Sequence, residues 1–143
     1  MWQTDIKYYG DRYVITFLDD CSRYVPSVIL CRHATTRRIL KFLDETLSVG
    51  RIPRQILCDG HEAQYYSEDG RSQFTAYLEA RGIEHITSSI GKPTTQAKIE
   101  RFFQTFELYY PRFNDITDFL EHYNYVRPDR SLNFLTPAEV YYS

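Results

Sequence analysis

The first thirty residues contain three strand-like segments, separated by short polar turns. The segments Trp2–Tyr9, Arg12–Leu18 and Tyr24–Leu30 are rich in β-branched and aromatic residues. Turn-forming residues lie between them, Gly10 after the first segment and Asp19-Asp20 after the second. Such segments joined by tight turns predict three consecutive strands of an antiparallel meander.

After the third segment the spacing of apolar residues changes to that of a helix. A helix is predicted from Thr35 or Thr36, with Ile39 and Leu43 on its apolar face, and it ends at Gly50. The rest of the pattern predicts a strand at 55–58, a loop at 60–70, a helix from 72 to 82, a strand at 83–87, a loop at 88–95, helices ending near 110 and starting near 115, and a last helix after 136.

The predicted order of elements is β-β-β-α-β-α-β-α-α. A meander followed by alternating helices and strands predicts an α/β domain. Its sheet is expected to be mixed and five-stranded, with three antiparallel strands, then parallel strands, and helices on both faces.

The composition is that of an ordinary globular domain: 143 residues, 43% hydrophobic and 25% charged. This length suits a single domain over residues 1–143. No apolar stretch approaches the ~20 residues that span a bilayer, so no membrane partner is expected. Three cysteines without a CxxC pair favour a reducing cytoplasm. Strand-like sequence directly after Met1 suggests a fragment of a longer protein.

Three acidic residues occupy positions that a fold could bring together. Asp5 lies within the first predicted strand, and Asp59 ends a strand where open sheets place their ligands. Glu100 lies beside Ile99, on the flank of a helix's apolar face. Each alone is equally compatible with a solvated surface carboxylate or a turn residue. Together they would offer the hard oxygen ligands that Mg²⁺ and Mn²⁺ prefer.

The net charge of −2 comes from 17 basic and 19 acidic residues. A protein that binds nucleic acid mainly by neutralising phosphates is usually more basic. A group of metal-binding carboxylates lowers the net charge, however, and bound cations reverse the local charge. The balance therefore does not exclude nucleic acid.

Several segments, taken in order, resemble a known family. WQTDI, ILCDG followed by QYYS, and GKPTTQAKIERFF are similar to the three catalytic segments of DDE transposases and retroviral-type integrases. YVITFLDDCSRYVPSVIL resembles the second and third strands of that family, and HYNYVRPDRSLNFLTPAEVYY resembles its closing segment. The resemblance covers nearly the whole chain and implies the ribonuclease-H-like fold of an integrase or insertion-sequence transposase core.

The resemblance also implies a site and a reaction. Asp5, Asp59 and Glu100 would hold two Mg²⁺ or Mn²⁺ ions, and the core would cleave DNA ends and transfer the strand without a covalent protein intermediate. The implied partners are element-end and target DNA and a second copy of the chain, with no small-molecule substrate. The expected location is a prokaryotic cytoplasm, at the nucleoid. Residues considered for DNA contact, each equally compatible with a solvated role, are Lys92, Lys98, Arg101, His61 and Gln64.

The chain departs from the family pattern after the second carboxylate. Asp59-Gly60-His61 has the glycine one position early, and Gln96-Ala97 replaces the usual Asn-Gly before the third segment. Two alternatives therefore stay open. One is a nuclease of the same fold that cuts without joining, and the other is an inactive core that docks DNA or dimerises. Cys58, at the end of its strand, is expected to pack inward as a small hydrophobe.

Overall fold

A computed structural model describes residues 1–59, 73–88 and 97–143, except for the side chains of Asp59 and Ser88. The strands are β1 (Trp2–Tyr9), β2 (Arg12–Asp19), β3 (Ser27–Cys31), β4 (Gln55–Asp59) and β5 (Glu84–Ser88). The α-helices are α1 (Thr36–Leu47), α2 (Gln73–Ala80), α3 (Ala97–Tyr109), α4 (Ile116–Glu121) and α5 (Pro137–Tyr141). Shorter turns of helix are η3 (Tyr110–Arg112), η4 (His122–Val126) and η5 (Arg130–Leu132). Both predicted loops, at 60–70 and 88–95, fall largely or wholly outside the described residues.

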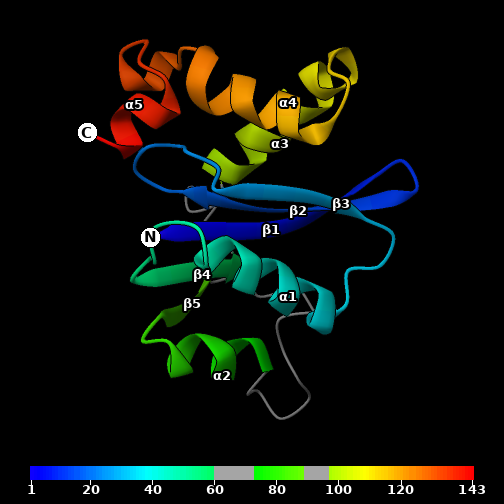
Figure 1. The fold of residues 1–143 in the computed structure, drawn as a ribbon, viewed down its shortest axis with the longest axis vertical. Coiled ribbons are helices and arrows are strands. Elements are labelled where there is room, and N and C mark those ends of the chain that lie inside the picture. Colours follow the sequence, from blue (N-terminus) through cyan, green and yellow to red (C-terminus); the bar gives the residue numbers. More distant parts are fainter. Residues whose placement is uncertain (60–72, 89–96) are drawn as a thin grey trace.

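The five strands form one mixed sheet in the order β3-β2-β1-β4-β5 (Figure 1). β1 pairs antiparallel with β2, and β2 with β3, whereas β4 runs parallel to both β1 and β5. The helices α1 and α2 follow β3 and β4 and return the chain for the next parallel strand. The predicted fold class and sheet composition are confirmed.

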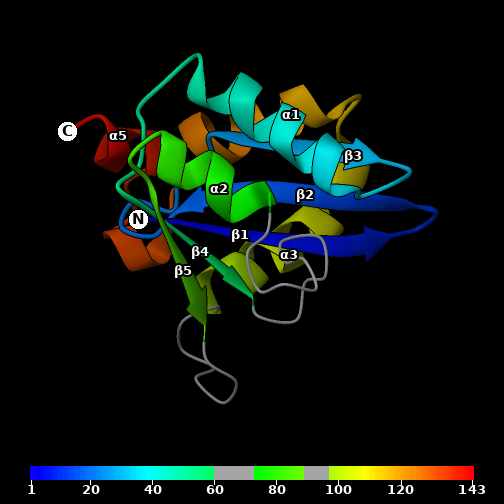
Figure 2. The same cartoon turned by 90° about the horizontal axis from the view of Figure 1, so that it is seen from below.

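Helices cover both faces of the sheet, with α1 and α2 on one face and α3 and α4 on the other (Figures 1 and 2). Alternation along β2 divides its buried side chains between the two faces. Ile15 and Phe17 pack in the cluster with α1 and α2, whereas Val14 and Leu18 pack in the cluster with α3 and α4. Cys58 is fully buried in the first cluster, so its expected packing role is confirmed.

The third strand begins later than predicted, at Ser27 rather than Tyr24. Val25 does not join the strand ladder, because its N–H donates to Asn124 Oδ1 and its carbonyl accepts from Asn124 Nδ2, both at 2.9 Å. The next residue, Pro26, has no N–H to donate to a strand. A side chain from the C-terminal part of the chain therefore replaces two strand hydrogen bonds.

The predicted helix near residue 115 also changes geometry partway. Asp115 caps α4, but after Glu121 the chain widens into the π-helix η4, whose closing bond runs from Arg127 N to His122 O at 2.8 Å. The wider turn buries two consecutive residues, Tyr123 and Asn124. Asn124, in this turn, is the residue that bonds the backbone of Val25.

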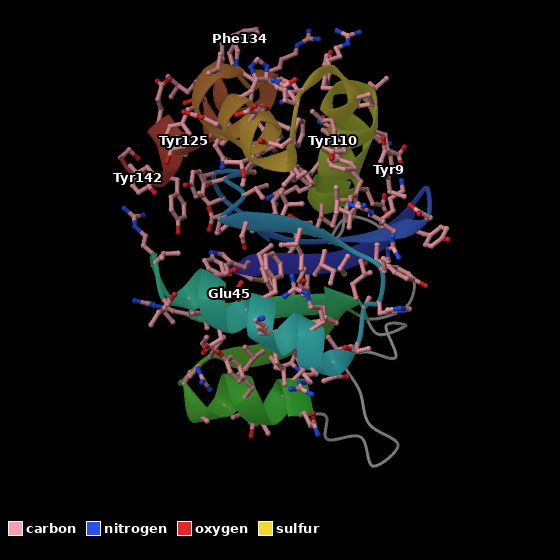
Figure 3. The ribbon with its side chains drawn as sticks, turned by 45° about the vertical axis from the view of Figure 1, so that its right-hand side comes forward. Tyr9, Glu45, Tyr110, Tyr125, Phe134 and Tyr142 are labelled. Atoms are coloured by element: carbon pink, nitrogen blue, oxygen red, sulfur yellow. The ribbon has the colours of Figure 1, made fainter. Side chains whose placement is uncertain are left out.

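Aromatic side chains fill the layer between the sheet and α3. Tyr9 of β1 lies beside Tyr110, with ring centroids 6.1 Å apart (Figure 3). Phe102 contacts four further rings, those of Phe103, Phe106, Phe119 and Tyr123. The ring contact that joins β1 to α3 is that of Tyr9 with Phe106, whose centroids are 5.1 Å apart. It packs α3 against the strand that carries Asp5.

Candidate active site

Asp5 lies in the middle of β1, the central strand of the sheet, and is half-buried. Its Oδ1 accepts the N–H of Ile6 at 2.8 Å, which limits the rotation of the carboxylate. The preceding residue, Thr4, is buried and donates its hydroxyl to Thr16 O of β2 at 3.0 Å. The backbone that carries Asp5 is thus held in place from the neighbouring strand.

Asp59 ends β4, the strand that runs parallel to β1. The last pair in the register between these strands joins Thr4 to Cys58. Asp5 and Asp59 each follow directly after a member of that pair, so their backbones occupy equivalent positions on adjacent strands. The side chain of Asp59 lies outside the described part of the structure.

Glu100 lies in the first turn of α3 and is exposed. It shares one hollow of about 350 Å³ with Asp5, although the two residues are far apart in the sequence. This carboxylate hollow is lined by Asp5, Ile6, Lys7, Glu100, Phe103 and Gln104. Glu100, Phe103 and Gln104 have the i, i+3, i+4 spacing of one helix face, which is why α3 presents all three to β1.

The charge in the carboxylate hollow favours cations. The basic side chain among its described lining residues is Lys7, whose Nζ lies 2.7 Å from Glu107 Oε1 and 5.8 Å from the centroid of the Phe103 ring. Lys7 thus forms an ion pair with a residue one helical turn beyond the hollow, at Glu107 of α3. Within the described residues no group of three His, Cys, Asp or Glu side chains could hold a metal ion. Asp5 and Glu100 offer oxygen ligands of the type that Mg²⁺ and Mn²⁺ prefer.

Lys98 and Arg101 lie on another side of α3. Lys98 Nζ is 3.1 Å from Asp20 Oδ1 and also donates to Asp20 O at 2.8 Å, so it is tied to the turn between β2 and β3. Arg101 is exposed. Neither residue lines the carboxylate hollow; both line a second hollow of about 330 Å³. The other three residues considered for DNA contact, His61, Gln64 and Lys92, lie outside the described residues.

The second hollow, here called the arginine hollow, contains basic residues that the sequence did not single out as binding residues. Arg23 comes from the turn after β2, and Arg127 and Arg130 come from the segment after η4. Its full lining is Arg23, Ala97, Lys98, Arg101, Phe102, Thr105, Tyr123, Arg127, Asp129, Arg130 and Ser131. In the sequence these arginines are scattered singly, so no charge run signals the hollow.

The sheet combines a three-stranded meander with two parallel strands. Acidic residues lie on its central strand and on a helix packed against that strand. This arrangement defines the ribonuclease-H-like class of fold. Two models of the integrase core domain match the chain, over residues 1–93 and 81–137. The chain therefore belongs to the integrase core domain family.

Individual relatives agree with this assignment. The chain is 27% identical over 135 residues to an uncharacterized 39.2 kDa protein of insertion element IS476 from Xanthomonas euvesicatoria. That match covers 87% of the chain and 38% of the relative, so the chain spans well under half of that protein.

Two solved structures have the same fold at low sequence identity. The catalytic core domain of BIV integrase has a TM-score of 0.77 at 15% identity, over 99% of this chain and 92% of that one. The HTLV-2 integrase catalytic core in complex with magnesium, in a dimeric form, has a TM-score of 0.70 at 19% identity, over 99% and 94% of the two chains.

No helix among the described residues has both the length and the apolar character that a membrane span requires.

Proposed function

We propose that this chain is the catalytic core of a metal-dependent polynucleotidyl transferase that cleaves DNA ends and joins them to target DNA. The observation that carries the proposal is the carboxylate hollow, in which Asp5 and Glu100 lie together. Membership of the integrase core domain family supports the same reaction class.

Asp5, Asp59 and Glu100 would hold two Mg²⁺ or Mn²⁺ ions. Asp5 and Asp59 occupy equivalent backbone positions on adjacent parallel strands, which supports their acting together. When bound, the cations would activate the attacking oxygen and stabilise the leaving oxygen of a phosphodiester.

Family membership and the solved relatives support a DNA partner and a multimeric assembly. The magnesium-bound HTLV-2 core was solved in a dimeric form, and we propose that this chain also acts on DNA as a homodimer or higher multimer. The cytoplasmic, nucleoid-associated location is part of the same proposal.

The test is a cleavage and strand-transfer assay on labelled duplex DNA, with Mg²⁺ or Mn²⁺ and with excess chelator. The proposal predicts products that require the metal and that disappear in Asp59→Asn and Glu100→Gln. The matched control is Glu45→Gln, because Glu45 is an exposed carboxylate on α1, across the sheet from α3 (Figure 3).

Three outcomes separate the alternatives. Activity that persists in chelator or in Asp59→Asn refutes the proposed site. Metal-dependent nicking without joined product identifies a nuclease of the same fold. Binding of DNA with no cleavage, together with no Mn²⁺ binding by calorimetry, identifies an inactive docking core.

A further inference from the structure

The arginine hollow gathers cationic side chains from three separate parts of the chain. The turn after β2 contributes Arg23, α3 contributes Lys98 and Arg101, and the segment after η4 contributes Arg127 and Arg130. Among the described lining residues the carboxylate is that of Asp129. The whole chain has a net charge of −2, so this concentration of positive charge is a local feature of the fold.

Most of these cations are not neutralised by neighbouring carboxylates. Lys98 is paired with Asp20, but within the described residues none of the four arginines of the hollow forms an ion pair. Arg23 is held by backbone carbonyls, since its guanidinium donates to Cys21 O at 3.1 Å. Asp129 accepts from the backbone and hydroxyl of its neighbour Ser131. Unpaired guanidinium groups in an open hollow are suited to an anionic ligand.

The walls between the cations are partly apolar and partly aromatic. Phe102 and Tyr123 both line the hollow and are buried. Burial raises the pKa of the Tyr123 hydroxyl, and Asp129 raises it further against the opposing charges of Arg127 and Arg23. Tyr123 therefore stays neutral and does not oppose an anion. The cations come from three separate segments around a hollow of about 330 Å³, and a backbone with several phosphates can contact more of them at once than a single phosphate can.

The arginine hollow and the carboxylate hollow share α3. Arg101 lines the first and Glu100 the second, and consecutive helical residues are separated by about 100° around the axis. The two hollows therefore open on different sides of the same helical turn, and a polyanion long enough to cross α3 could reach both.

We propose that the arginine hollow binds the phosphodiester backbone of DNA and orients the duplex across α3 toward the carboxylate hollow. The inference rests on the proposed function for the identity of its ligand. It adds Arg23, Arg127 and Arg130 to the DNA-contacting surface, together with the predicted residues Lys98 and Arg101. Lys98, through its bond to Asp20, mainly positions the turn that carries Arg23.

The test measures binding of a 20-base-pair duplex by fluorescence anisotropy at several salt concentrations, in chelator so that no cleavage contributes. The double variant Arg101→Gln/Arg130→Gln removes two exposed guanidinium groups that have no ion pair to lose within the described structure. Each phosphate contact contributes about 0.9 to the slope of log affinity against log salt. The proposal predicts a slope smaller by roughly 1.8 and weaker binding at low salt.

The matched control is Arg37→Gln/Lys41→Gln, which removes the same charge from two exposed positions of α1, across the sheet. It should leave the slope unchanged. Thermal unfolding by circular dichroism checks that both double variants fold. If Arg101→Gln/Arg130→Gln does not fold, Arg130→Gln alone replaces it, and the predicted decrease in the salt slope is then about 0.9.

An unchanged slope in the hollow variant, an equal fall in the control, or no binding by the parent chain at low salt overturns the proposal. Loss of inorganic phosphate binding without any change in the DNA slope also overturns it, in favour of a small-anion site. The assay needs no metal and no cleavage. DNA binding in the arginine hollow can therefore be confirmed when the catalytic proposal fails, and it can be refuted when the catalytic proposal holds.

Discussion

Asn124 is predicted to contribute more to stability than any exposed polar residue, because it satisfies both backbone groups of a buried residue. Val25 has no exposed surface, and its N–H and carbonyl bond only the Asn124 amide at 2.9 Å among the described contacts. The substitution Asn124→Ala leaves one donor and one acceptor unpaired. Each buried orphan group costs about 1–3 kcal/mol, so the free energy of unfolding should fall by roughly 2–6 kcal/mol.

This loss would be a large part of the domain's stability, since the free energy of unfolding of a domain is about 5–15 kcal/mol. Urea denaturation followed by circular dichroism measures it, and the control Asn114→Ala, at an exposed position, should change the free energy by less than about 0.5 kcal/mol. The turn after β2 and the segment after η4 both line the arginine hollow. Asn124→Ala should therefore weaken DNA binding as well.

Asn124→Asp gives a sharper test, because an ionised carboxylate can accept from Val25 N–H but cannot donate to its carbonyl. Burial raises the pKa of such a carboxyl above its unfolded value of about 3.9. The neutral carboxyl of this variant stabilises the folded state fully below the unfolded pKa, and this stabilisation is lost as the pH rises through the folded pKa. The deficit of this variant should shrink between pH 7 and pH 4, whereas that of Asn124→Ala should not. Equal deficits at both pH values would refute the reasoning.

Two further predictions concern the two faces of the sheet. Phe102 is fully buried among four rings, so Phe102→Ala should lower the free energy of unfolding by about 3–5 kcal/mol. In the same denaturation assay Leu108→Ala, at a position 67% exposed, should have little effect, and similar losses would contradict the packing argument. Burial lowers the pKa of His85 from its ordinary 6.5, against the opposing charge of Glu79. Below about pH 6.5 the unfolded chain binds more protons than the folded one. The free energy of unfolding should therefore decrease as the pH is lowered. Denaturation at pH 7.5 and 5.5 should show a smaller fall for His85→Gln, and an identical fall would contradict the assignment.

Local patterning predicted most of the elements. Strand β1 has the predicted ends, and Thr35 caps α1 as expected, accepting from Arg38 N at 3.2 Å. These features depend on side-chain periods of 2 and 3.6 residues and on capping within one helical turn. Such interactions involve near neighbours in sequence, so they can be read without knowing the fold.

The start of the third strand could not be read in this way. Tyr24 and Val25 have the composition of a strand, but the partner of Val25 is Asn124. The π-helical turn that turns Asn124 inward has no marker in the apolar pattern, since the periodicity before it is that of an ordinary α-helix. The backbone of Val25 bonds a side chain about a hundred residues away instead of the neighbouring strand. Local strand propensity contains no information about such a distant partner.

For the candidate site, the sequence by itself determined which residues have metal-ligand chemistry and, through resemblance, which three of 19 acidic residues to choose. It did not determine that Asp5 and Glu100 share a hollow, nor that single arginines from three segments surround another. Those arrangements depend on how α3 packs against β1 and on where η4 meets the turn after β2. Periodicity encodes which face of an element is buried, but the meeting of two faces is decided only when the whole core packs.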